Sequence, residues 1–204
     1  MSQWVLASGN AGKLAEFSRL LEPLSIDVRP QGEFGVSDAD ETGLSFIENA
    51  ILKARHAAAA TGLPALADDS GLVVDALNGE PGIYSARFSA RAGGASGDSA
   101  NIDHLLSRLD GIPAAERSSH YYCLLAFVRH ANDPTPLIAE GRWDGRILTE
   151  RVGTGGFGYD PVFYLQEQDC TAAQMESSLK NRLSHRGKAM ATFMPQLQAM
   201  LGQE

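Results

Sequence analysis

Six residues near the start of the chain, Ser8-Gly9-Asn10-Ala11-Gly12-Lys13, have the composition of an anion-binding turn. They follow a short apolar run, Trp4-Val5-Leu6-Ala7, and they precede apolar residues at helical spacing between Leu14 and Leu24. The pattern predicts a strand, a glycine turn and a helix with Lys13 in its first turn. Backbone N–H groups and the positive end of the helix dipole would then point to one spot, where a phosphate group can bind.

The turn differs from the two common phosphate-binding motifs. Only two residues separate Gly9 from Gly12, and Leu14 follows Lys13 where the nucleoside triphosphatase loop has a serine or threonine. No third glycine stands where the dinucleotide-binding pattern needs one. A tight turn with a surface lysine is therefore the alternative interpretation.

Two adjacent carboxylates, Asp68 and Asp69, stand between strand-like runs at 64–67 and 72–77 and are followed by Ser70. Like charges side by side repel each other unless a cation lies nearby, and Mg²⁺ needs only one or two carboxylates besides phosphate oxygens and water. One carboxylate could instead accept a proton from an attacking water. A solvated turn is the alternative, since Asp, Ser and Gly all favour turns.

A second acidic group, at residues 38–41, precedes a helix that apolar spacing predicts from Ile47 to Ala58. The helix dipole is a sufficient reason for acidic residues at that place, so local sequence alone gives Glu41 no metal role. Asn49 and Lys53 are four residues apart and face the same way on the polar side of the helix. Spacing alone assigns that side to solvent.

Residues 153–161 are rich in glycine, with Phe157 and Tyr159 on either side of Gly158 and with Asp160 before a proline. The glycines permit a positive φ or close approach of the backbone to a ligand. The two aromatic rings offer flat faces to a nucleobase. A glycine-rich hairpin connection is the alternative.

Lys180, His185 and Arg186 form a dense basic patch before a C-terminal helical pattern. Arg186 has the planar pair of donors that suits a purine or phosphate edge. A cationic helix entry is the alternative, although positive charge at a helix N-terminus opposes the helix dipole.

The remaining elements complete an α/β pattern with a mixed sheet. Further expectations are strands at 24–28, 121–129 and 137–143, a turn at Asp144-Gly145, a mobile loop at 89–99, helices at 101–109 and 185–201, and a kink or break at Pro195.

Composition limits the classes of function. A length of 204 residues suits one domain, and an apolar content of 44% suffices for a full core. The net charge of −8 argues against nonspecific nucleic-acid binding, so a polyanionic substrate would need a local basic pocket. Cys123 and Cys170 show no metal-ligand spacing and are expected to be reduced thiols in a cytoplasmic protein. Neither a secretory signal nor a membrane span is recognisable.

Taken in order, these segments resemble the inosine triphosphate pyrophosphatase family, also called XTP/dITP pyrophosphatases, and most of all its bacterial members. The matching blocks span almost the whole chain. They are residues 8–13, 41–43 with 46–50, 66–72, 81–87, 153–161 and 184–187. Ser8 stands where many members have threonine, and Leu179 where the family often has glutamate before the lysine. The second departure bears on how Lys180 is oriented.

The resemblance implies a magnesium-dependent, homodimeric enzyme that hydrolyses ITP, dITP and XTP to the nucleoside monophosphate and pyrophosphate. It also implies an elongated mixed β-sheet flanked by helices, with two lobes around a central active-site cleft. Asp69 would be the catalytic carboxylate and a metal ligand, Glu41 would assist the metal, and Ser70 would touch the substrate. The triphosphate would be held by Ser8, Gly9, Asn10, Ala11, Gly12 and Lys13. The base and sugar would contact Phe157, Gly158, Tyr159, Asp160, Lys180, His185 and Arg186.

Two alternatives to this function remain open. The Maf-like nucleotide pyrophosphatases resemble this family in fold and reaction but prefer other bases. A catalytically silent nucleotide sensor is less consistent with the paired carboxylates, because binding alone does not favour negative charge beside a triphosphate.

Overall fold

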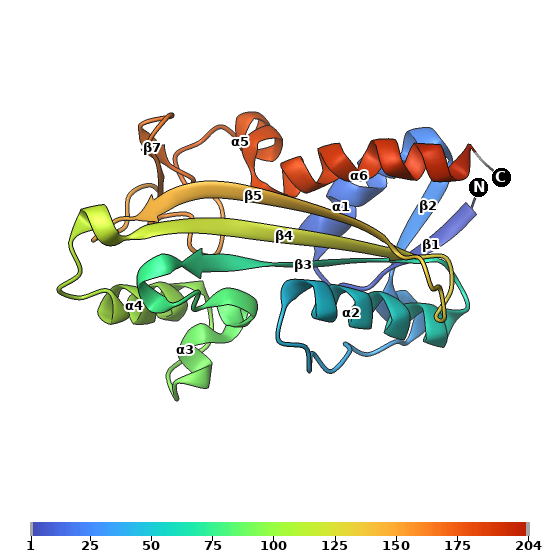
Figure 1. The fold of residues 1–204 in the computed structure, drawn as a ribbon, viewed down its shortest axis with the longest axis horizontal. Helices are drawn as coiled ribbons and strands as arrows, with labels where there is room; N and C mark the ends of the chain where they lie inside the picture. The colour runs from blue at the N-terminus through green and yellow to red at the C-terminus, as the bar shows by residue number, and fades with distance from the viewer. Residues whose placement is uncertain (1, 203–204) are drawn as a thin grey trace. The chain divides into compact units, whose positions relative to one another are not determined.

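A mixed sheet of seven strands, in the order β2-β1-β3-β4-β5-β6-β7, organises the computed structural model, which describes residues 2–202 (Figure 1). The strands are β1 (Ser2–Leu6), β2 (Ile26–Pro30), β3 (Ala65–Val74), β4 (Ser118–Val128), β5 (Leu137–Ile147), β6 (Phe163–Leu165) and β7 (Cys170–Thr171). The described α-helices are α1 (Ala11–Leu21), α2 (Phe46–Thr61), α3 (Phe88–Arg91), α4 (Asp98–Arg108), α5 (Ser177–Leu183) and α6 (His185–Leu201). The predicted α/β class with a mixed sheet is confirmed.

The described chain divides into two compact units. The first comprises the residues through Asp69, then Leu124–Glu140, then the residues from Met190 onward. The second comprises Ser70–Cys123 and Gly141–Ala189. The single domain over residues 1–204 that the sequence predicts stays a prediction. No helix within residues 2–202 is long and apolar enough to cross a membrane.

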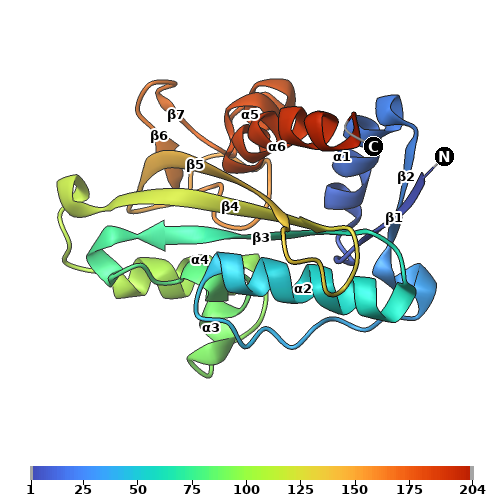
Figure 2. The same cartoon turned by 45° about the vertical axis from the view of Figure 1, so that its right-hand side comes forward.

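In the first unit, β1 lies between two parallel neighbours, β2 and β3. Its residues Trp4, Val5 and Leu6 are buried, as expected for a strand covered on both faces. Helices α1 and α2 lie on opposite sides of these strands (Figures 1 and 2). Because β1 and β2 are parallel, the chain leaves both strands at the same edge of the sheet, and the segments that lead to α1 and α2 start there.

The core of the second unit is rich in aromatic side chains. Buried Tyr121, Trp143, Tyr159 and Phe163 belong to one cluster with the apolar residues of β3, α4 and β5. Tyr159 is itself one of the predicted substrate-binding residues, and its backbone N–H donates to the Tyr121 hydroxyl.

A turn was predicted at Asp144-Gly145 and was the alternative interpretation for residues 68–71, and both turns are wrong because the residues lie inside strands. Asp68-Asp69-Ser70-Gly71 forms the middle of a continuous β3, since sheet pairing overrides the local turn preference of these residues. Asp144-Gly145 lies within β5. A Cβ at Gly145 would come within 2.6 Å of the Phe163 ring and 2.8 Å of the Tyr164 carbonyl oxygen, so this glycine allows β6 to approach closely.

Two other local predictions need correction. The segment 89–99, expected to be a mobile loop, includes most of α3, in which Ser89 is buried and its backbone N–H donates to Asn101 at 2.9 Å. Of the kink or break expected at Pro195, the break is absent, because α6 runs through this residue to Leu201, and the kink stays a prediction. Buried Phe193 and Leu197 flank Pro195 and keep this part of the helix packed on the core.

Candidate active site

The predicted anion-binding turn has the expected structure. Asn10 is the N-cap of α1, and its Oδ1 accepts a hydrogen bond from the Lys13 backbone N–H at 3.0 Å. Ser8 Oγ accepts from the Asn10 N–H at 3.2 Å. Gly9, Asn10, Ala11 and Gly12 are exposed. The turn therefore presents the N-terminus of α1 to solvent directly after β1, as an anion site requires.

Lys13 is not the surface lysine of the alternative interpretation. Its Nζ lies 2.9 Å from Oδ1 of Asp68, and the Lys13 side chain is only 20% exposed. The Asp68 carboxylate is fully buried, and it holds the lysine beside the turn. The Lys13 ammonium group is thereby fixed at the N-terminus of α1, where an anionic ligand would bind.

Lys53 of α2 joins the acidic residues on the other side of β3. Its Nζ lies 2.6 Å from Asp69 Oδ1, 3.2 Å from Glu41 Oε1 and 3.1 Å from the Asp68 carbonyl oxygen. Alternation along β3 explains why adjacent Asp68 and Asp69 meet lysines from helices on opposite faces. Asp69, Glu41 and the turn that carries Lys13 are thus brought into one cluster within the first unit.

The cluster has one more negative charge than positive when Glu41, Asp68, Asp69, Lys13 and Lys53 are all ionised. Burial raises the pKa of Asp69, and nearby Glu41 and Asp68 add to this effect, so that the attraction of Lys53 is outweighed. Burial lowers the pKa of Lys53, but Asp69 and Glu41 more than offset it, and the pKa lies above its ordinary value. The lysine stays charged, while the carboxylate holds its proton more firmly than an exposed aspartate does.

The carboxylates fit a magnesium ion. Within residues 2–202 no three His, Cys, Asp or Glu side chains are grouped as a metal site. Mg²⁺ needs fewer protein ligands, because phosphate oxygens and water complete its shell. Asp69 Oδ2 is buried, and it has no hydrogen-bond partner among the described residues, although such atoms are normally paired. This oxygen, with Glu41 close by, is suited to a cation that arrives with the substrate.

Asn49 fixes the segment that carries Glu41, although spacing assigned its side chain to solvent. The residue is fully buried, and its Oδ1 accepts from the Gly43 N–H at 2.9 Å. A Cβ at Gly43 would lie 2.6 Å from that oxygen, so the approach requires glycine. The prediction of a solvated face was therefore wrong for both Asn49 and Lys53.

The glycine-rich segment of the second unit folds around Asp160. Asp160 is 2% exposed, and its Oδ2 accepts from the Phe157 N–H at 2.8 Å and pairs with Lys180. Gly156 has φ +75°, and a Cβ there would lie 2.1 Å from the same carboxylate oxygen. Lys180 Nζ also lies 4.8 Å from the centre of the Phe157 ring, which is 64% exposed. Phe157, Asp160 and Lys180 are thus brought together.

Tyr121, which sequence reasoning did not single out, connects this segment to the start of α6. Its ring stacks on His185 with 4.8 Å between ring centres and 12° between planes. Its hydroxyl accepts from the Tyr159 N–H at 3.2 Å. Ser184 is the N-cap of α6, since its Oγ accepts from the Gly187 N–H at 3.2 Å. Arg186 follows His185 in the first turn and is partly exposed.

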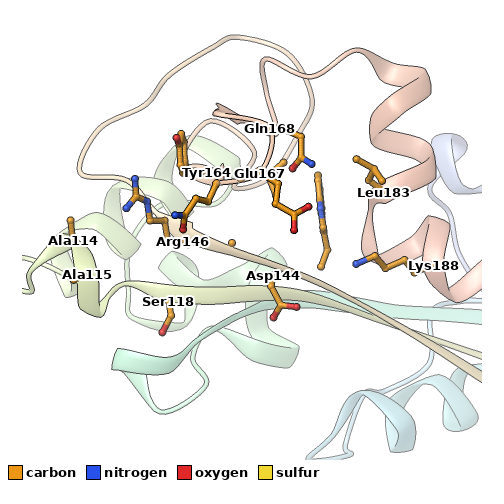
Figure 3. Close-up of a pocket in the computed structure, with 14 residues that line it drawn as sticks. Ala114, Ala115, Ser118, Asp144, Arg146, Tyr164, Glu167, Gln168, Leu183 and Lys188 are labelled. Carbon is orange, nitrogen blue, oxygen red and sulfur yellow. The ribbon is translucent and has the colours of Figure 1, made fainter.

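A pocket of about 790 Å³ lies elsewhere in the second unit (Figure 3). Acidic Asp144 and Glu167 and basic Arg146 and Lys188 are among its lining residues, so opposite charges balance. Among the described residues that line it, none belongs to the predicted substrate site. The pocket therefore does not change the assignment of the candidate site.

The comparison with known proteins agrees with the predicted family. The sequence model of the Ham1 family matches residues 4–196. A dITP/XTP pyrophosphatase of Vibrio parahaemolyticus is 52% identical over the full length of both chains, and one of Xanthomonas oryzae pv. oryzae is 56% identical over 98% of this chain and 99% of the relative. A solved HAM1 protein from Coxiella burnetii has a TM-score of 0.90 and 46% identity over all of both chains. A solved nucleoside-triphosphatase/dITP/XTP pyrophosphatase from Mycobacterium abscessus has a TM-score of 0.78 and 40% identity, with 96% of this chain and 99% of that chain covered. The chain belongs to the Ham1 family.

Proposed function

We propose that this protein is a pyrophosphatase of the non-standard purine nucleotides dITP, XTP and ITP, which it hydrolyses to the nucleoside monophosphate and pyrophosphate. Full-length relatives at 52% and 56% identity bear the name dITP/XTP pyrophosphatase. The structural observation that carries the proposal is Asp69, a buried carboxylate beside Lys53 with one oxygen left without a partner among the described residues. Without a metal, negative charge beside a triphosphate opposes binding, whereas a hydrolase can use such a carboxylate as proton acceptor and metal ligand.

Asp69 is the proposed proton acceptor of the reaction. Hydrolysis adds one water, breaks the bond between the α-phosphorus and the oxygen that bridges it to the β-phosphorus, or the corresponding bond on the β side, and releases one proton. Asp69 takes this proton. Lys53 Nζ, 2.6 Å from Asp69 Oδ1, keeps the carboxylate oriented and partly offsets the rise in pKa that burial causes.

Asp69 and Glu41 would hold Mg²⁺. When bound, the ion supplies positive charge to the phosphate oxygens and lowers the cost of developing negative charge. Asn49 supports this arrangement, because it ties the backbone at Gly43 to α2 and so fixes the segment on which Glu41 stands.

The triphosphate binds at the turn formed by Ser8, Gly9, Asn10, Ala11, Gly12 and Lys13. The free N–H groups of the first turn of α1 meet the phosphate oxygens. Lys13, held beside the turn by Asp68, meets the charge that grows on the leaving pyrophosphate. Ser70, which follows Asp69 in β3, contributes a hydroxyl to the substrate.

The nucleobase and sugar bind to a second group of residues. The exposed Phe157 ring stacks on the purine. Arg186 has donors and no acceptor, so it favours a 6-oxo purine over adenine. The complete proposed set is Phe157, Gly158, Tyr159, Asp160, Lys180, His185 and Arg186.

The further properties implied by the resemblance are proposed with the function. They are two lobes around an active-site cleft, a homodimer, and a cytoplasmic location, which is where nucleotide pools are found. Size-exclusion chromatography with light scattering measures the assembly, and a monomer at micromolar concentration would contradict the dimer.

Pyrophosphate release from a panel of triphosphates tests the function. We expect ITP, dITP and XTP to be hydrolysed in the presence of Mg²⁺ with kcat/KM well above that for ATP and GTP. Preference for modified pyrimidine triphosphates would instead favour the Maf-like reaction. Binding of ITP without release of pyrophosphate would favour the nucleotide sensor.

A further inference from the structure

Tyr121 of β4 has contacts that a core residue does not need. It is 8% exposed, and its ring lies parallel to the imidazole of His185, 4.8 Å away and tilted by 12°. Aromatic rings at this distance and angle attract each other beyond simple burial. The ring of Tyr121 therefore defines the plane in which the His185 imidazole lies.

The hydroxyl of Tyr121 reaches the glycine-rich segment as well. It accepts a hydrogen bond from the Tyr159 N–H at 3.2 Å, and a Cβ at Gly158 would lie 3.8 Å from it. Tyr159 in turn donates its own hydroxyl to the Ser85 carbonyl oxygen at 2.8 Å. One side chain thus contacts both segments that are proposed to hold the base.

The surroundings keep Tyr121 in one position. The Phe163 ring contacts it edge-on at 4.7 Å, and Trp143 lies behind it with 6.4 Å between ring centres. The start of α6 is equally constrained, because a Cβ at Gly141 would lie 2.0 Å from the His185 carbonyl oxygen. Neither partner of the stack can shift without disturbing a packed strand.

We propose that Tyr121 is a positioning residue for base recognition, acting through His185 and through the backbone at Tyr159. The proposal rests on the function proposed above, in which His185 contacts the base. Polar groups discriminate between bases only when they are held at fixed positions, because a mobile donor or acceptor adapts to either base. Tyr121 supplies that rigidity without touching the substrate.

Substitutions at Tyr121 separate its ring from its hydroxyl. Tyr121→Leu removes the stack on His185, and it should lower kcat/KM for ITP about tenfold, mainly through KM, with a smaller loss for ATP. Tyr121→Phe keeps the stack and loses only the contact with Tyr159, so the loss should stay below about threefold. Tyr122→Leu, on the opposite face of β4, is the matched control and should retain activity.

A double-mutant cycle decides whether the effect passes through His185. The variant Tyr121→Leu/His185→Ala should lose less than about threefold in kcat/KM for ITP relative to His185→Ala alone, because only the contact with Tyr159 remains to be lost. A full tenfold further loss in the double variant, or an equal loss for ITP and ATP with a lowered Tm, would mean that Tyr121 only supports the fold. Should Tyr121→Leu fail to fold, Tyr121→Met replaces it, since methionine fills the space without a ring.

The same experiment distinguishes the inference from the proposed function. If wild-type protein does not release pyrophosphate from ITP, the function is wrong. If wild-type protein is active and the two substitutions are additive, the function stands and the role of Tyr121 is wrong.

Discussion

Lys53→Met removes the cation that Asp69 and Glu41 share, and its effect can be worked from the structure. Both carboxylate oxygens lie within 3.2 Å of Lys53 Nζ, so they are within about 6 Å of each other. With the lysine removed, the repulsion between the two carboxylates, about 3 kcal/mol at an effective dielectric constant of about 20, is no longer compensated by a cation. Without the lysine, Asp69 therefore holds its proton more firmly still and is a poorer proton acceptor.

An uncompensated repulsion of about 3 kcal/mol corresponds to about 10²-fold in rate, and we expect a loss of this order in kcat/KM for Lys53→Met with ITP at pH 7. Activity of this variant should recover partly as the pH rises, because a higher pH removes the proton that Asp69 retains. Pyrophosphate release at a series of pH values measures both effects. Lys53→Arg keeps the charge and should lose less, and Lys188→Met, at an exposed lysine of α6, is the matched control.

Either of two results would contradict the role of the Lys53 charge. Lys53→Met could retain more than half of the wild-type kcat/KM at pH 7. Alternatively, Lys53→Arg could be as inactive as Lys53→Met with no recovery at high pH, which would assign Lys53 a role in shape rather than in charge.

Three further predictions concern other parts of the chain. Hydrogen bonds from Arg129 lower the pKa of buried Asp133 far below the ordinary aspartate value, so its carboxylate stabilises the fold above the ordinary pKa and loses that contribution only as the pH falls through the lowered value. Urea unfolding should therefore show Asp133→Asn to be destabilised most at pH 7, slightly less near pH 3 and much less near pH 2, and an equal loss at pH 7 and pH 2 would contradict this. Lys13→Ala should raise KM for ITP and lower kcat in steady-state assays, whereas unchanged constants would make Lys13 a structural partner of the carboxylates. Arg186→Ala should lose more kcat/KM with ITP than with ATP, and Phe157→Ala should lower both in similar proportion; equal losses for ITP, GTP and ATP in Arg186→Ala would refute its role in base selection.

Local sequence predicted the parts of the site that depend on neighbouring residues. The turn that leads from β1 into α1, with Lys13 in the first turn of the helix, was predicted because it needs only an apolar run, glycines and helical spacing in neighbouring residues. The glycines of residues 153–158 likewise predicted a close approach of the backbone to another group. Sequence did not predict that at Gly156 this group is the Asp160 carboxylate.

The remaining parts depend on contacts between distant segments. Lys53 stands on a helix whose spacing predicts a solvated side, and only the position of β3 beside it makes the lysine a partner of Asp69. Asp68 and Asp69 favour a turn locally, and pairing within the sheet overrides that preference. Alternation along β4 explains the burial of Tyr121, but it does not predict which ring from α6 will stack on it.

Asp69→Asn tests the central claim most directly, because the amide has the size of the carboxylate but cannot accept the proton or bind Mg²⁺ as a charged ligand. With saturating Mg²⁺ and ITP, pyrophosphate release should fall by at least about 10²-fold, with far-UV circular dichroism unchanged from the wild-type protein. A variant that folds normally and retains more than about a tenth of the wild-type kcat would contradict the assignment of Asp69 as the catalytic carboxylate.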